Sequence, residues 1–288
     1  MILDGFSIAS ILLKLVLYVA SLGGAGLVLF RIALAGQPKV EEVVSRRLIA
    51  IAAIVGMLVT LLRFGVQGAL LSGNLSGLVD RAMLNILWST PAGTVVEMRL
   101  AGFALLLLAS FEFRWRNWIG LLGALLILGS FVVVGHATNV DQVGVSALLL
   151  IHLMTAAFWI GALRPLYIAS LAFEPRDAAE IAHRFGVMAS VAVPVLVVVG
   201  GVFAWLLVGT LSNLFESRYG QMLILKVLLV SAVLGLAALN KFRLVPAMME
   251  GDQSSVQSLK RSIKMEAGLI GIALLVTAVL TSVLSLPQ

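Results

Sequence analysis

Four side chains in this sequence have the chemistry to hold a soft metal ion. His136 and His152 lie in consecutive apolar stretches joined by a short connection, so we expect them on neighbouring antiparallel helices. Met98 and Met222 lie within two helical turns of the ends of two other apolar stretches. Imidazole nitrogen binds copper, zinc and iron, and thioether sulfur selects Cu(I). The four residues are therefore candidate metal ligands.

The same residues also have ordinary structural explanations. A neutral His can donate a hydrogen bond to a neighbouring helix, and a single Met in an apolar helix is usually packing filler. Two His on neighbouring helices can also ligate one haem iron axially. His183, the third histidine, precedes an apolar stretch and suits a solvated loop end. The chain has no cysteine, which excludes disulfides, thiolate metal sites and a Cys nucleophile.

The composition indicates that membrane-spanning helices position these side chains. Of the 288 residues, 61% are hydrophobic and 12% are charged, against about 25% charged residues in a soluble domain. A span needs about 20 mainly apolar residues. The sequence therefore predicts an all-α polytopic membrane protein, a single domain over 1–288. The eight stretches that qualify as spans are 7–35, 46–71, 93–112, 117–137, 144–171, 186–209, 219–241 and 266–285.

The distribution of basic residues predicts the orientation. If the N-terminus faces outward, 14 of the 20 basic residues lie in inner loops and helix ends, and only Arg81 and Arg218 lie in outer loops. Cytoplasmic loops carry the excess of Lys and Arg in membrane proteins, so we expect both termini outside. The basic residues form no single tract, which argues against nucleic-acid binding. The inner residues are Arg31, Lys39, Arg46, Arg47, Arg114, Arg116, Arg164, Arg176, Arg184, Lys241, Arg243, Lys260, Arg261 and Lys264.

Four cations fall inside the predicted spans, in their outer halves: Lys14, Arg63, Arg99 and Lys226. They can snorkel toward the headgroups, pair with acidic residues of the outer loops, or line a positively charged outer vestibule. Such a vestibule suits an anion better than a bare metal cation. As delimited above, the spans contain no deep carboxylate, so we expect no carboxylate-driven proton relay.

Two further patterns concern packing and the longest outer loop. Paired glycines inside spans, such as Gly120 with Gly123 and Gly268 with Gly271, permit close approach of helices. In the loop 72–92, residues 78–88 are typical of a short amphipathic helix that anchors at the membrane surface or docks a partner. The chain has no nucleotide-binding motif and no paired nucleophile and base, so we do not expect an enzyme.

Several short motifs together resemble the CopD copper-resistance membrane family. They occur in the order and spacing of that family over residues 90–250, and the eight-span pattern extends the resemblance to the whole chain. The motifs are Gly135-His136-Ala137, His152, Phe158-Trp159-Ile160-Gly161-Ala162-Leu163-Arg164-Pro165-Leu166, Arg184-Phe185, Tyr219-Gly220-Gln221-Met222-Leu223-Ile224-Leu225-Lys226 and Ala238-Leu239-Asn240-Lys241-Phe242-Arg243-Leu244-Val245-Pro246.

The resemblance implies a protein of the bacterial inner membrane that transports copper, delivered by a periplasmic copper-binding protein of CopC type. We expect copper, with Cu(I) favoured, to enter from the periplasmic side through His136, His152, Met98 and Met222. Two other functions stay open. One is a haem-binding membrane redox protein with His136 and His152 as axial ligands. The other is a non-transporting subunit that binds a copper chaperone through the 72–92 loop.

Overall fold

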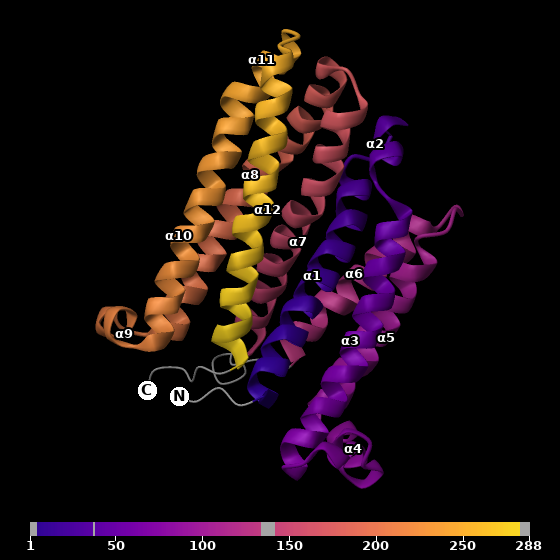
Figure 1. Cartoon of the computed structure of the whole chain (residues 1–288), viewed down its shortest axis with the longest axis vertical. Coiled ribbons are helices and arrows are strands. Elements are labelled where there is room, and N and C mark those ends of the chain that lie inside the picture. The colour runs from indigo at the N-terminus through magenta and orange to yellow at the C-terminus, as the bar shows by residue number, and fades with distance from the viewer. Residues whose placement is uncertain (1–4, 37, 134–141, 283–288) are drawn as a thin grey trace. The chain divides into compact units, whose positions relative to one another are not determined.

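The computed structural model describes residues 5–36, 38–133 and 142–282, which form helices joined by short connections and no strand (Figure 1). The elements in order are α1 (Gly5–Ala33), α2 (Pro38–Val43), α3 (Arg46–Ser72), a 3-10 helix (Leu75–Leu78), α4 (Arg81–Trp88), α5 (Pro91–Leu108), α6 (Arg116–Val133), α7 (Gln142–Ala172), α8 (Pro175–Val208), α9 (Leu211–Glu216), α10 (Arg218–Leu239), a π-helix (Asn240–Leu244), α11 (Val245–Met249) and α12 (Gln253–Ser282).

Eight helical segments of the described chain are long and apolar enough to cross a membrane. The prediction of an all-α protein with eight spans is therefore confirmed. The segments are Ile8–Ala33, Arg46–Ser72, Pro91–Leu108, Arg116–Val133, Gly144–Ala172, Pro175–Val208, Arg218–Met249 and Gln253–Ser282.

The last three spans are longer than their apolar stretches predict. The sixth begins at Pro175 and the eighth at Gln253, each more than two turns before the predicted start. Charged residues do not end these helices, because helical backbone continues where side chains are solvated or paired. Arg184 and Glu180, for example, form an i,i+4 ion pair at 2.9 Å on α8. The apolar stretch therefore locates the part of the helix that can lie in hydrocarbon. It does not locate the end of the helix.

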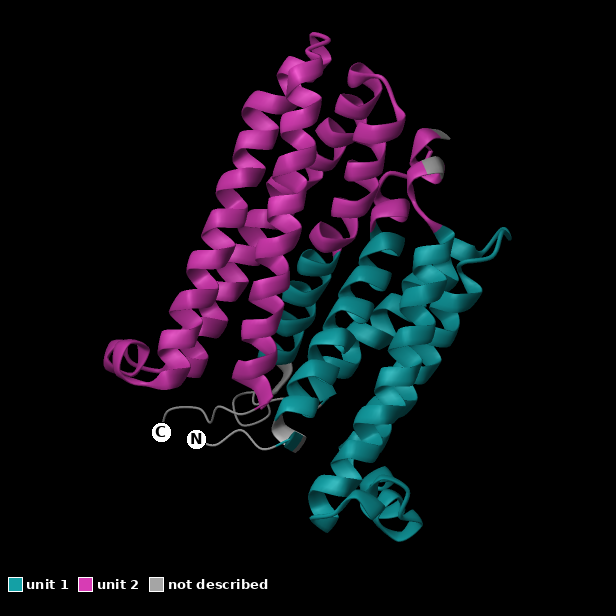
Figure 2. Ribbon diagram, viewed as in Figure 1, with its two compact units in different colours: residues 1–29, 46–157 teal, residues 30–45, 158–288 magenta. Residues whose placement is uncertain are grey.

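The chain divides into two compact units (Figure 2). Unit 1 comprises residues 1–29 and 46–157, and unit 2 comprises residues 30–45 and 158–288. Two of the three boundaries fall inside continuous helices, one in α1 and one in α7, and the third lies at the start of α3. The prediction of a single membrane domain over 1–288 stays a prediction.

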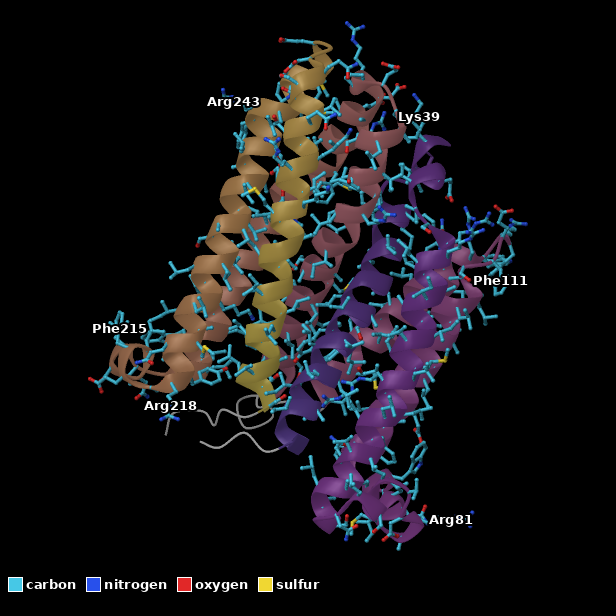
Figure 3. All side chains as sticks on the ribbon, viewed as in Figure 1. Lys39, Arg81, Phe111, Phe215, Arg218 and Arg243 are labelled. Carbon is cyan, nitrogen blue, oxygen red and sulfur yellow. The ribbon has the colours of Figure 1, made fainter. Side chains whose placement is uncertain are left out.

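Within each unit, successive connections lie at opposite ends of the helices. Figure 3 shows Arg81, the first residue of α4, and Phe111, after α5, at opposite ends of unit 1. In unit 2, Arg218 at the start of α10 and Arg243 in the π-helix are likewise separated by the length of α10. This alternation agrees with helices that cross a bilayer in turn. Which end faces outward stays a prediction.

The helices of unit 1 make close contacts at glycines. A Cβ atom placed on Gly56 of α3 would fall 2.2 Å from the ring of Phe103 on α5. A Cβ on Gly123 of α6 would fall 2.7 Å from the carbonyl oxygen of Gly102 on α5. These backbones approach as closely as they do because no side chain separates them, which is how helices gain contact in a bilayer.

The predicted role of the paired glycines is confirmed for one pair and stays a prediction for the other. Gly120 and Gly123 of α6 both pack closely, the first against Val28 of α1 with 2.8 Å to a built Cβ. Gly268 and Gly271 of α12 have nothing within 4 Å of a built Cβ. Glycine spacing on one helix cannot reveal whether another helix faces it.

The predicted amphipathic helix of the 72–92 loop is α4. The Asp80 carboxylate caps it by accepting a 2.9 Å hydrogen bond from the Ala82 N–H. Leu87 is buried against Phe64 of α3, and the Trp88 ring lies edge-on to the same Phe64 ring at 5.7 Å between centroids. α4 therefore packs against α3 within unit 1. Its anchoring at the membrane surface stays a prediction.

We expect Gly123→Ala to destabilise the protein by about 1–3 kcal/mol, because the added methyl forces α5 and α6 apart. Thermal unfolding of the detergent-purified protein measures this. Gly23→Ala is the matched control, since a Cβ on Gly23 of α1 meets nothing within 4 Å. Equal melting temperatures for the two variants would contradict the close α5–α6 contact.

Asp252, between the last two spans, caps α12. Its carboxylate accepts hydrogen bonds from the hydroxyl of Ser255 at 2.5 Å and from the N–H of Ser254 at 2.9 Å. These bonds, the Ser255 hydroxyl first, hold the pKa of the Asp252 carboxyl below its ordinary value. A carboxyl with a lowered folded-state pKa adds stability above its unfolded pKa and loses that contribution as pH falls through the folded pKa.

We therefore expect Asp252→Ala to lower the melting temperature at neutral pH and to leave it unchanged at strongly acidic pH, where the wild-type carboxyl is protonated too. Thermal denaturation of both proteins over a pH series measures the difference. A difference that persists undiminished in acid would show that the cap does not depend on the charge.

Candidate functional site

The structure places two of the four predicted metal ligands in unit 1. His152 lies on α7, partly buried, and its backbone carbonyl accepts a 3.0 Å hydrogen bond from the Thr155 hydroxyl. Met98 lies on α5, with its terminal methyl directed at Gly129 of α6, 3.5 Å from a Cβ built there. His136 lies outside the described residues. Met98 is thus part of the α5–α6 contact.

Met222 belongs to unit 2 and packs in an apolar cluster. It lies on α10 against buried Val208, Tyr219, Val276 and Leu280. In this position it has the packing role of an ordinary core methionine. Across residues 5–36, 38–133 and 142–282, no three His, Asp or Glu side chains gather into a metal-binding group. The four-residue copper site stays a prediction.

Three of the four in-span cations come together in unit 1. Lys14 of α1 is close enough to both Arg63 of α3 and Arg99 of α5 for their positive charges to act on it. Arg63 donates a 3.1 Å hydrogen bond to the backbone carbonyl of Ser10 on α1. We call these three residues the cation cluster. Lys226, the fourth in-span cation, lies on α10 in unit 2.

Arg99 is the most firmly held member of the cation cluster. Its Nε donates a 2.9 Å hydrogen bond to the Ser130 hydroxyl of α6, and its guanidinium lies 4.6 Å from the centroid of the Phe131 ring. Tyr18 of α1 packs on the same ring, at 5.5 Å between centroids. In the part of the chain that the structure describes, neither Arg63 nor Arg99 forms an ion pair with a carboxylate. The predicted outer vestibule stays a prediction.

Unit 2 contains a buried carboxyl that the sequence reading missed. Glu266 lies near the middle of α12 and is 3% exposed. Its Oε1 accepts a 2.6 Å hydrogen bond from the side-chain amide of Asn240, in the π-helix. Its Oε2 accepts a 3.3 Å hydrogen bond from the indole N–H of Trp159 on α7. The expectation that the spans hold no deep carboxylate is wrong.

The error came from the boundary of the last span. The apolar stretch begins at Glu266, which therefore read as a helix-end residue, whereas the helix begins at Gln253. Trp159 carried a usable signal, because an indole far from both ends of a span needs a hydrogen-bond acceptor inside the protein. A search for that acceptor among acidic residues next to spans would have included Glu266.

Comparison with known proteins gives matches along most of the chain. Residues 4–143 match the family described as Copper resistance protein D-like, N-terminal domain, and residues 179–280 match the family described as Copper resistance protein D. The first match covers most of unit 1, with the cation cluster and Met98. The second lies in unit 2 and includes Asn240 and Glu266.

A curated relative carries a copper-related name. The chain is 29% identical over 219 residues to the copper transport protein CutJ of Bacillus subtilis (strain 168). The match covers 70% of this chain but only 38% of the relative. No solved structure matches this chain. Two copper-resistance matches in series, on a bundle with eight candidate spans and with the motifs in family order, place the chain in the CopD copper-resistance family.

Proposed function

We propose that this protein carries copper across the bacterial inner membrane and is not an enzyme. The observation that supports this most strongly is the pair of copper-resistance family matches, over 4–143 and 179–280, on a chain with eight candidate membrane spans. The name of CutJ points the same way for the part that the two proteins share. A soluble copper-binding protein of CopC type is the proposed donor.

The candidate copper ligands remain His136, His152, Met98 and Met222. Two or three soft ligands can hold Cu(I) without trapping it, a condition that any conducting site must meet. Met98 packs at the α5–α6 contact, so it would have to turn its sulfur away from that contact to bind metal. Met222 would have to leave its apolar cluster to bind metal.

The charge of unit 1 favours Cu(I) over Cu(II) as the transported ion. Coulomb repulsion grows in proportion to the charge of the approaching ion. A singly charged copper ion beside Arg99 is therefore repelled half as strongly as a doubly charged one at the same distance. Neutral sulfur and imidazole ligands add no further charge to the site.

We expect the His136→Ala/His152→Ala double variant to lose the copper that the purified wild-type protein binds, because it lacks both nitrogen ligands. Metal analysis and an absorption spectrum of detergent-purified wild type and variant measure this. Unchanged copper binding and uptake in the variant would contradict the proposed site. A Soret band lost in the variant, with no copper bound to wild type, would replace copper transport by haem binding.

We expect Met98→Leu to weaken Cu(I) binding about tenfold or more, the loss of one ligand being worth at least 1.4 kcal/mol. Leucine is close to methionine in volume, so the α5–α6 packing should hold. Met57→Leu on α3 is the matched control, an in-span methionine of the same unit that is not in the proposed site. Titration with a competing Cu(I) chelator measures both, and equal affinities would remove Met98 from the site.

A further inference from the structure

Glu266 has two hydrogen-bond partners and no described ionic partner. Both of its hydrogen-bond partners, the indole of Trp159 and the amide of Asn240, are neutral. Burying a carboxylate costs free energy unless a cation pairs with it, whereas a protonated carboxyl is neutral. A carboxyl in this setting can hold a proton as well as a charge.

The charged groups on the neighbouring elements are engaged elsewhere or turned outward. Lys264 of α12 lies over the Tyr167 ring of α7, 5.3 Å from its centroid. Lys241 of the π-helix donates a hydrogen bond to the Ser190 hydroxyl of α8, and Arg243 is exposed. Lys226 of α10 lies 14 residues before Asn240, about 21 Å along the helix, and α11 carries no charged residue.

Asn240 is built to serve both charge states of Glu266. Its amide nitrogen donates to Oε1 of the carboxyl, while its carbonyl oxygen Oδ1 is buried and has no hydrogen-bond partner among the described residues. An amide carries a donor and an acceptor of nearly the same shape. A half-turn of this side chain would present Oδ1 to the carboxyl, where it can accept the O–H of a protonated Glu266. The buried oxygen without a partner then acquires one.

The backbone around Asn240 is irregular. Asn240 begins the π-helical turn between α10 and α11, and such turns occur frequently at functional sites. The same turn is bonded to α8 through Lys241 and Ser190, while Glu266 is bonded to α7 through Trp159. A change at the carboxyl therefore acts directly on the π-helix and on α7, and it reaches α8 through the π-helix.

We propose that Glu266 is a proton-binding site, with Asn240 as its positioning partner, and that it gains and loses a proton during transport. The transport half of this inference rests on the proposed copper function. The proton-binding half does not, since it concerns only residues of unit 2. Such a site would let a proton gradient drive the transport of copper.

Infrared difference spectroscopy of the purified protein between acidic and alkaline pH tests the proton site without copper. We expect the carbonyl stretch of a buried protonated carboxyl in wild type and its loss in Glu266→Gln. Glu250→Gln, at an exposed carboxylate of the same unit, should keep the band. Trp159→Phe retains the carboxyl and should displace the pH midpoint of the band, which covers the case in which Glu266→Gln fails to fold. Identical spectra from all four proteins would overturn the proposal.

Copper flux into proteoliposomes that contain a pH-sensitive dye tests the transport half. We expect wild type and Glu250→Gln to couple flux to a pH change, and Glu266→Gln to bind copper but transport it about tenfold more slowly, with the pH change lost. Full flux and pH change in Glu266→Gln would overturn the coupling and leave copper transport standing. A Glu266 infrared band without any copper flux in wild type would contradict the copper function and leave the proposed proton site standing.

Discussion

A polar side chain inside a lipid bilayer must find its partner within the protein, because hydrocarbon offers none. This constraint explains the most specific contacts in the spans. Arg63 bonds to the backbone of α1, Arg99 to the Ser130 hydroxyl, and Glu266 to Trp159 and Asn240. Each contact joins two helices that apolar packing alone would leave free to rotate about their axes. Polar pairing therefore helps to fix the rotation of each of these helices about its own axis.

The two units satisfy this constraint with different chemistry. Unit 1 gathers three cations and stabilises Arg99 with neutral groups, a hydroxyl and an aromatic ring. Unit 2 buries a carboxyl and stabilises it with an indole and an amide. In both cases the partners are dipoles instead of opposite charges. A charge held by dipoles alone stays responsive to an incoming ion or proton, whereas one neutralised in an ion pair does not.

The eight spans were predictable because each is a local property of about 20 residues, readable without knowledge of any partner. The α4 helix was predictable for the same reason, from the amphipathic pattern of residues 78–88. Contacts between helices were not. Trp159 and Glu266 lie 107 positions apart, and nothing in the sequence pairs them. Likewise Gly123 and Gly271 look equivalent in sequence, yet only Gly123 has another helix against it. The membrane segments can be recognised from local composition, whereas the contacts between them depend on how the helices pack in three dimensions.

The division between the units limits how this protein can be taken apart. One boundary falls between Ala157 and Phe158, which are consecutive residues of α7. A gene cut there would leave pieces of α7 of 16 and 15 residues, each shorter than the roughly 20 residues that a span needs. A split-protein reporter on this scaffold should instead be cut between α7 and α8, where Ala172 and Pro175 bracket the connection. The two polypeptides would then each contain only whole membrane segments.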